Sequence, residues 1–456
     1  MGLGTGRLLP YESRAMTDTK TYRIKSFGCQ MNVYDGERMG ELLGEKGMRA
    51  AKDGEDADLV VLNTCHIREK AAEKAYSDVG RLAKNEKKPM VALAGCVAQA
   101  EGGEAQRRSE HIDIVVGPQA YHRLPELVEQ AAKGARPVDT DMPAISKFDA
   151  MPKRRRSGPS AFLTVAEGCD KFCTYCVVPY TRGTEISRPW SDIVDEALAL
   201  VDGGAKEITL LGQNVSAWSG ENEKGQQGGL ELLVRRLARI DGLERIRYTT
   251  SHPADMDEGL IAAHGEEPKL MPYLHLPVQA GSDRILKAMN RHHTVDSYLK
   301  LIERFRAARP DLAISGDFIV GFPGETDAEF EETLQVVRDA DYASAYSFKY
   351  SPRPGTPAAD MDGQVAPQVM DERLQRLQAL LSEQSLAFNR SKIGTQMDIL
   401  IDRVGKREGQ MIGKSPWLQS VFVATDADIG DILTVDIADA LPNSLHGITS
   451  PKEAAA

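Results

Sequence analysis

Cysteine is scarce in this sequence, and it contains neither a long apolar run nor an excess of basic charge. Only six of the 456 residues are cysteine, too few for a disulfide framework, so we expect a reducing compartment in which thiols serve metal binding or catalysis. The longest apolar run, Met90 to Ala98, is far shorter than the roughly 20 residues of a membrane-spanning helix, which excludes a transmembrane protein. With 56 Lys and Arg against 67 Asp and Glu, the net charge is −11. The molecule as a whole is therefore not a basic nucleic-acid coat, although a local basic surface for RNA is compatible with it.

The length of the chain indicates several domains. At roughly 100 to 200 residues per domain, it should hold about three. The first twenty residues lack the apolar core of a signal peptide, so we interpret them as a disordered leader in a cytoplasmic protein, and Met16 as well as Met1 could start translation. Changes in pattern divide the chain into a leader at residues 1–20, an N-terminal domain at 21–138, a linker at 139–160, a core at 161–387 and a C-terminal domain at 388–456.

The N-terminal domain alternates short β-type runs with helical ones, including one helical run from Ala98 to Arg108. This rhythm favours an open parallel α/β sheet. Each of the first three strands runs into a turn with one cysteine, namely Cys29, Cys65 and Cys96. Because parallel strands end at one shared edge, where ligands normally bind, these thiols can converge. They can hold an iron–sulfur cluster with one iron lacking a protein ligand, and the alternative is three buried apolar cysteines.

A second group of cysteines opens the core. Cys169, Cys173 and Cys176 have the spacing C-x3-C-x2-C, and no fourth cysteine follows. A 4Fe-4S cluster held there would keep one iron open for a non-protein ligand, which implies chemistry rather than electron storage. Zinc is the competing metal, but structural zinc normally has four protein ligands, and this loop contains no histidine.

Beyond this loop, alternating strands and helices predict a partial (β/α) barrel of about six units. In such barrels the carboxyl ends of the strands build the active site. The turns that follow the strands are polar or rich in glycine, and they contain Gln213, Asn214 and Gln279. Each turn alone is expected to do no more than reverse the chain, but their shared location favours a site. After the helix from Asp371 to Lys392, short β runs predict a small β-barrel of about sixty residues.

Two groups of basic residues are candidate contacts for RNA. Lys153 to Arg156 in the linker are four consecutive cations, which would either contact phosphates or belong to a flexible, solvated tether. In the C-terminal domain the basic residues lie early and the acidic residues mostly late, which indicates a polarised surface. The early basic residues are Arg403, Lys406, Arg407 and Lys414.

Together these motifs resemble the methylthiotransferases of the radical S-adenosylmethionine (SAM) superfamily. The signature C-x3-C-x-aromatic-C, with Tyr175 as its aromatic residue, is shared with radical SAM enzymes. The surroundings of the first three cysteines are similar to the N-terminal methylthiotransferase domain, and the C-terminal domain resembles a TRAM domain. The run from Cys176 to Gly183 is similar to the MiaB-type tRNA branch, whereas Val278 to Ser282 departs from the Gln-Ser-Gly-Ser expected in the family.

The resemblance implies a radical reaction on tRNA with two 4Fe-4S clusters and SAM as cofactors. Cys169, Cys173 and Cys176 would hold the cluster that binds and reductively cleaves SAM, and the other three cysteines would hold a second cluster that carries the sulfur. Hydrogen would be abstracted from C2 of N6-isopentenyladenosine at position 37, next to the anticodon, and replaced by a methylthio group whose methyl comes from a second SAM. The implied partners are the tRNA anticodon stem-loop, an electron donor such as flavodoxin or ferredoxin, and a sulfur donor. Nothing requires more than a monomer.

Supporting roles follow as hypotheses from the same resemblance. Tyr175 would pack on SAM or on its cluster loop, and Arg182 would contact the substrate or the sulfur ligand. Asn32 would fix its own loop, and His66 beside Cys65 is an alternative ligand. The residues that would contact the polar groups of SAM are Gln213, Asn214 and Gln279. Two rival functions are the same reaction on another substrate, either threonylcarbamoyladenosine in tRNA or an aspartate of a small-subunit ribosomal protein, and a non-catalytic iron–sulfur carrier or RNA-binding protein.

Overall fold

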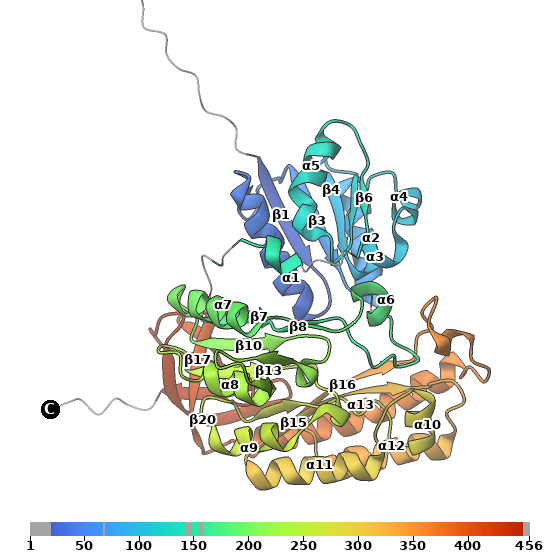
Figure 1. Ribbon diagram of the computed structural model, residues 1–456. Coiled ribbons are helices and arrows are strands. Elements are labelled where there is room, and N and C mark those ends of the chain that lie inside the picture. The colour runs from blue at the N-terminus through green and yellow to red at the C-terminus, as the bar shows by residue number, and fades with distance from the viewer. Residues whose placement is uncertain (1–19, 67–68, 143–146, 153, 155–157, 450–456) are drawn as a thin grey trace, which may run out of the picture.

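The protein has three folded parts that follow one another along the chain. A computed structural model describes residues 20–66, 69–142, 147–152, 154 and 158–449. An N-terminal sheet domain stands on a central open barrel, and a small closed barrel packs beside the central one (Figure 1). Within the described residues, no helix combines the length and the apolarity needed to cross a bilayer.

The N-terminal domain is built on a parallel six-stranded sheet in the order β2-β1-β3-β4-β5-β6. Neighbouring side chains of a strand point to opposite faces. In β3, Leu59 and Val61 therefore pack toward α1 and α5, whereas Val60 and Leu62 pack toward α2 and α3. Covering both faces with helices is typical of parallel sheets. The elements are β1 (Thr21–Ser26), α1 (Gln30–Glu45), β2 (Arg49–Ala50), β3 (Leu59–Thr64), α2 (Glu69–Leu82), β4 (Met90–Gly95), α3 (Cys96–Glu101), α4 (Glu104–Arg108), β5 (Ile114–Val116), α5 (Leu124–Ala132) and β6 (Val138–Asp139).

The single helix expected from Ala98 to Arg108 is wrong, because two short helices, α3 and α4, occupy that stretch. The break falls at Gly102, whose φ of +52° is left-handed. A residue in that conformation ends a right-handed helix, and glycine adopts it without steric cost.

The expectation of a flexible, solvated linker is wrong at two residues. Lys147 begins the one-turn helix η2 (Lys147–Ala150) and is buried, with its Nζ 2.6 Å from Glu167 Oε1. Arg154 is also buried, and its Nη2 donates to Glu37 Oε2 at 2.8 Å. Their carboxylate partners belong to other parts of the fold, so the local sequence gives no sign of this burial. The other three cations of the run from 153 to 156 lie outside the described residues.

The central part confirms the partial barrel predicted from the sequence. Two parallel three-stranded sheets, β13-β10-β7 and β14-β15-β16, are linked by a bridge between Ile246 and Leu270. Six strands thus form an open barrel with β7 and β16 at its edges. One large apolar cluster joins these strands to the surrounding helices. The main elements are β7 (Ser160–Thr164), α7 (Trp190–Asp202), β10 (Glu207–Leu211), α8 (Leu230–Leu237), β13 (Arg245–Tyr248), α9 (Glu258–Glu266), β14 (Tyr273–His275), α10 (Asp283–Ala288), α11 (Val295–Ala308), β15 (Ala313–Val320), α12 (Asp327–Ala340), β16 (Ser344–Lys349) and α13 (Pro367–Arg390).

The C-terminal part is a closed five-stranded barrel in the order β17-β18-β19-β21-β20, which confirms the expected small β-barrel. Its interior contains Ile399, Val421 and Val435. At Gly447, an added Cβ would lie 3.1 Å from side-chain atoms of both valines, so the backbone of the last strand runs directly against the barrel core. The strands are β17 (Gln396–Val404), β18 (Gln410–Lys414), β19 (Ser420–Ala424), β20 (Ile432–Leu441) and β21 (Ser444–Thr449).

Candidate active site

The ends of β1, β3 and β4 bring three cysteines together, here called the N-terminal triad (Cys29, Cys65 and Cys96). Cys29 caps the start of α1, Cys65 follows β3, and Cys96 begins α3 directly after β4. The Cys29 thiol hydrogen-bonds with Cys65 and lies within electrostatic range of Cys96. At Gly28, with φ +104°, an added Cβ would lie 2.3 Å from the Cβ of Cys65. Only glycine permits this close approach of the two turns.

The surroundings of the N-terminal triad raise the pKa of two of its thiols, those of Cys29 and Cys96. The hydrogen bond with Cys65, together with burial, holds the pKa of the Cys29 thiol well above its usual range. Burial raises the pKa of Cys96, and the guanidinium of Arg182 opposes this rise. Metal binding releases the protons of such thiols and leaves thiolates as ligands. Three converging thiols at one sheet edge fit an iron–sulfur cluster.

Asn32 organises the turn that carries Cys29, as expected from the sequence. Its Nδ2 donates to the Phe27 carbonyl at 2.8 Å, and its own carbonyl accepts from Asn63 Nδ2 at 2.7 Å. Its Oδ1 lies 3.7 Å from the Cys29 sulfur and 3.3 Å from Arg182 Nη2. Asn32 therefore fixes the loop and links the triad to Arg182.

The other three cysteines, called the core triad (Cys169, Cys173 and Cys176), occupy the loop between β8 (Ala166–Glu167) and α6 (Val178–Arg182). This loop lies at the junction with the N-terminal domain (Figure 1). Thr174 anchors it from both sides, because its N–H donates to the Met289 carbonyl at 3.1 Å and its carbonyl accepts from the Ala358 N–H at 2.9 Å. These contacts fix the loop to the open end of the barrel.

Burial also raises the pKa of two thiols of the core triad. It raises the pKa of Cys169 to about 11 and that of Cys176 to about 12. Arg291 Nη1 lies 3.7 Å from the Cys173 sulfur, which places a fixed positive charge beside the triad. Among the residues that the structure describes, no three His, Cys, Asp or Glu side chains are close enough to share one metal ion. A 4Fe-4S cluster gives each thiolate its own iron and so accepts wider spacing than zinc does.

Gln213 and Asn214, both expected to contact SAM, differ in whether their side-chain polar atoms already have hydrogen-bond partners. Gln213 Oε1 accepts from the Gly168 N–H at 2.6 Å, while its Nε2 is buried without a hydrogen-bond partner among the described residues. Asn214 already has partners, since its Nδ2 donates to Asp255 Oδ2 at 2.7 Å and its Oδ1 accepts from Ser216 Oγ at 3.0 Å. Gln213 thus keeps a free donor next to the core triad.

Tyr175 and Gln279 lie at the same open end. Tyr175 packs against an apolar cluster that includes Phe322 and Tyr350, so it holds the cluster loop on the barrel. Gln279 has φ +81° and pairs through its backbone with Phe318. This left-handed conformation in a non-glycine residue is a strained feature of the kind that collects at functional sites.

Three polar residues near the core triad received no role from the sequence. Ser251 Oγ and His252 Nε2 are buried without hydrogen-bond partners among the described residues, and the buried ring of His293 lies beside them. The two imidazole rings stand 5.8 Å apart. Burial lowers the pKa of His252 to about 2 and that of His293 to about 3. Unpartnered buried polar atoms point to a polar ligand, and neutral imidazoles can both donate to it and accept from it. The only signal in the sequence was the polar turn that contains Ser251 and His252.

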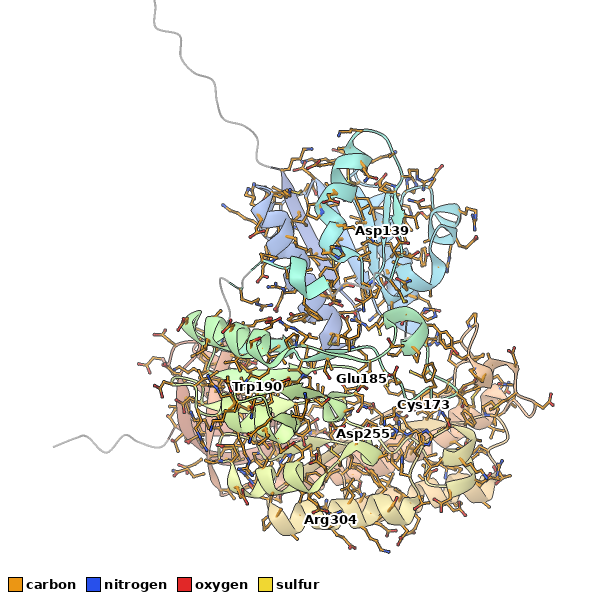
Figure 2. All side chains as sticks on the ribbon, in the orientation of Figure 1. Asp139, Cys173, Glu185, Trp190, Asp255 and Arg304 are labelled. Atoms are coloured by element: carbon orange, nitrogen blue, oxygen red, sulfur yellow. The ribbon has the colours of Figure 1, made fainter. Side chains whose placement is uncertain are left out.

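Carboxylates complete this end of the barrel. Figure 2 shows Glu185 and Cys173 in the part of the core below the N-terminal domain, with Asp255 beneath them. Burial and the neighbouring Asp255 raise the pKa of Glu185. Lys171 Nζ, in the cluster loop, contacts Asp255 Oδ1 at 2.6 Å. The site therefore offers groups of both signs, as the zwitterionic amino-acid part of SAM requires.

Family models match all three parts of the chain. Residues 21–117 match an uncharacterized protein family, UPF0004. Residues 163–337 match the radical SAM superfamily, and residues 390–449 match the TRAM domain.

Several relatives are similar over almost their whole length. The tRNA-2-methylthio-N(6)-dimethylallyladenosine synthase of Erythrobacter litoralis is 67% identical, over 94% of this chain and 97% of that protein. The enzyme of the same name from Sphingopyxis alaskensis is 68% identical, over 93% and 97%. Among solved structures, the radical SAM methyltransferase TsrM from Kitasatospora setae, with cobalamin and a [4Fe-4S] cluster bound, is similar in fold at a TM-score of 0.54 and 13% identity, over 74% of this chain and 76% of that one.

Proposed function

The chain belongs to the radical SAM methylthiotransferase family, among the tRNA-2-methylthio-N(6)-dimethylallyladenosine synthases, and we propose that its two cysteine triads divide the reaction between them. The core triad would hold the 4Fe-4S cluster that binds SAM, and the N-terminal triad would hold a second 4Fe-4S cluster. When bound, these groups supply the abstraction of hydrogen from C2 of N6-isopentenyladenosine at position 37 of tRNA, and the sulfur and methyl group that replace it.

The contribution of the protein is binding, orientation and exclusion of water. Gln213, Ser251 and His252 would bind polar groups of SAM, because each keeps a buried atom without a partner among the described residues. Tyr175 holds the cluster loop in place. With its neighbouring cation Arg291, the core triad is pre-organised for its cluster. Fixed geometry of this kind lowers the cost of bringing the reacting groups together.

One observation carries the proposal: helix α6, which directly follows the core triad, reaches the N-terminal triad. Its last residue, Arg182, shares the Oδ1 atom of Asn32 with the Cys29 thiol. Helix α6 therefore connects the two triads across the junction of the domains, and we infer that a substrate base activated beside one could receive sulfur from the other. A carrier of electrons would not need this arrangement.

The C-terminal barrel would contribute to binding the anticodon stem-loop. Arg403, Lys406 and Arg407 are exposed around the β17–β18 turn and are available to phosphates. Lys414 does not share this surface, because it is partly buried and its Nζ donates to Ser420 Oγ at 3.0 Å. We further propose a monomer that works in the cytoplasm on tRNA, with a flavodoxin or ferredoxin as electron donor and a separate sulfur donor.

An anaerobic turnover assay tests this function. The reconstituted protein is incubated with SAM, a strong reductant, sulfide and an isopentenylated anticodon stem-loop, and the digested nucleosides are analysed by mass spectrometry. We expect a 2-methylthio product. If SAM is cleaved but the RNA stays unchanged, the substrate assignment is wrong, and the threonylcarbamoylated stem-loop and the ribosomal protein become the next substrates. If SAM is not cleaved, the enzymatic role fails.

Single cysteine variants test the division of labour. We expect Cys173→Ala to abolish SAM cleavage altogether, because the core triad loses a ligand. Cys65→Ala should still cleave SAM to 5′-deoxyadenosine but form no methylthio product, because sulfur delivery is lost. Iron content of both variants should fall to about half of the wild-type value if each triad holds one cluster of equal size. Loss of SAM cleavage in Cys65→Ala would contradict the division.

A further inference from the structure

Four charged side chains are buried together at the junction of the two cysteine-bearing domains. Asp35 on α1, Lys147 on η2, Glu167 on β8 and Arg182 on α6 are between 1% and 4% exposed. Glu167 Oε1 lies 2.6 Å from Lys147 Nζ and 2.6 Å from Arg182 Nη1. Asp35 Oδ2 lies 2.7 Å from Arg182 Nη2, and Asp35 Oδ1 lies 3.7 Å from Lys147 Nζ. We call these residues the junction network.

Burying the four charges of the junction network costs more free energy than apolar contacts between the domains would. Taking four charges out of water costs several kcal/mol per ion before pairing, and apolar residues of the same volume often give equal or greater stability. The network is also incomplete, because Asp35 Oδ1 accepts no hydrogen bond from any described residue. Stability alone therefore does not account for four charges at this place.

The network joins the two triads. Glu167 lies two residues before Cys169, at the entrance to the cluster loop. Arg182 reaches the other triad, because Asn32 Oδ1 accepts from its Nη2 at 3.3 Å and lies 3.7 Å from the Cys29 sulfur. Asp35 of the N-terminal domain and Glu167 of the core both form ion pairs with the Arg182 guanidinium, so its position relative to both triads is fixed.

We propose that Arg182 is the positioning residue of the N-terminal triad: its guanidinium, fixed by Asp35 and Glu167, offsets the negative charge of the cluster bound there and sets its reduction potential. This inference rests on the proposed function in taking the N-terminal triad as a cluster site. Net charge and hydrogen bonds around the sulfur atoms are the main protein determinants of cluster potentials. A fixed cation favours the reduced, more negative state, and arginine keeps its charge even when buried.

A second buried arginine provides the matched control. Arg154 also ties the segment between the domains to α1, through Glu37 at 2.8 Å and Glu41 at 3.4 Å. The structure gives Arg154 no contact with a cysteine. The carboxylate partners of Arg154 are more exposed than those of Arg182, at 44% for Glu37 and 23% for Glu41. Substituting Arg154 therefore removes a second buried cation at the same junction while leaving Arg182 and its partners in place.

The test measures the potential of the N-terminal cluster alone. In the full chain with all three core-triad cysteines changed to alanine, the reconstituted cluster is titrated potentiometrically and followed by electron paramagnetic resonance. We expect Arg182→Met to lower the reduction potential, Arg182→Lys to restore most of it, and Arg154→Met to match the parent. If the Arg182→Met variant does not retain a full cluster, Arg182→Gln is used in its place. Its reduction potential is then compared with those of the parent, Arg182→Lys and Arg154→Met in the same way.

Two results would overturn the proposal. One is a reduction potential in Arg182→Met, or in Arg182→Gln where that variant replaces it, equal to that of the parent. The other is a fall of the same size in the reduction potential of Arg154→Met.

A parallel readout uses the chain with all six cysteines, where Arg182→Met should form more 5′-deoxyadenosine per methylthio product than the wild type does. Failure of the wild type to form that product would defeat the proposed function but leave the potentials interpretable, so the two failures are distinguishable.

Discussion

At the scale of single residues, His264 makes the stability of the core depend on pH. Its Nε2 shares a hydrogen bond of 2.7 Å with the Tyr248 hydroxyl, while Nδ1 is buried without a partner among the described residues. Burial lowers the pKa of His264 to about 3. An unfolded histidine binds its proton near pH 6.5. The unfolded state therefore gains the proton first, and stability falls as the pH drops from about 6.5 toward 3.

We predict that His264→Gln reduces this acid sensitivity. Its free energy of unfolding should fall between pH 7 and pH 5 by about 2 kcal/mol less than that of the wild type, since one proton is worth roughly 1.4 kcal/mol per pH unit. Chemical denaturation of both proteins at the two pH values measures the difference. His111→Gln is the control, because the His111 side chain is 40% exposed. An identical fall in wild type and His264→Gln would contradict the prediction.

The sequence identified candidate site residues best where their spacing along the chain is itself the signal. The six cysteines stand out because their positions relative to strand ends and to one another are local properties. The contact of Arg182 with Asn32 and the burial of Lys147 depend instead on how separate domains meet. The same holds for Ser251 and His252, whose importance lies in polar atoms left without partners, and only three-dimensional packing creates that condition.

At the scale of elements, the turn between β1 and α1 requires glycine at position 28. We predict that Gly28→Ala displaces Cys65, because the new Cβ would lie 2.3 Å from its Cβ and the φ of +104° is costly for alanine. If the two triads divide the clusters as proposed, most of the iron held by the N-terminal triad, about half of the total, should be lost, while SAM cleavage at the core triad should continue. Iron analysis and 5′-deoxyadenosine assays measure the two effects.

The Gly54→Ala variant is a control for Gly28→Ala, because it introduces backbone strain without a steric clash between side chains. Gly54 also has a positive φ, +79°, but nothing lies within 4 Å of an added Cβ there. This variant should lose roughly 1 to 2 kcal/mol of stability from backbone strain and keep its full iron content. Equal iron loss in both variants would mean that strain in the domain, rather than contact with Cys65, controls the cluster site.

Elements with clear periodicity were predictable, and the exceptions have local causes. The βαβ order of the N-terminal domain and the open barrel follow from alternating patterns that each run for several residues. The break between α3 and α4 depends on Gly102, whose left-handed φ is one of several conformations that glycine adopts. The last strand, β21, contains a glycine that weakens its β pattern in the sequence, although Gly447 is needed where the backbone runs against Val421 and Val435.

At the scale of the whole molecule, the C-terminal barrel is fastened to the core by two arginines from β13. Arg245 and Arg247 are buried, and Arg247 Nε donates to Glu207 Oε2 at 2.9 Å. Their terminal nitrogens donate at 2.7 to 2.8 Å to backbone carbonyls of the barrel, those of Asp398, Lys414, Ser415 and Pro416. Carbonyl acceptors at four points fix the orientation of the barrel, and with it the distance from Arg403 and its neighbours to the cysteine triads.

We therefore predict that Arg247→Met uncouples RNA binding from radical chemistry. The change leaves the Glu207 carboxylate buried without its ion pair and two carbonyls without donors, a loss of about 3 to 5 kcal/mol for a broken buried pair. The KM for the stem-loop should rise about tenfold or more, while SAM cleavage without RNA persists. Limited proteolysis should cut more readily between α13 and β17. Arg236→Met is the control, because Arg236 is 35% exposed and pairs at 3.2 Å with Glu223, which is 57% exposed. If the Arg247 variant resists protease and binds RNA as the control does, the barrel does not depend on this contact for its position, and RNA must be held mainly by the other two domains.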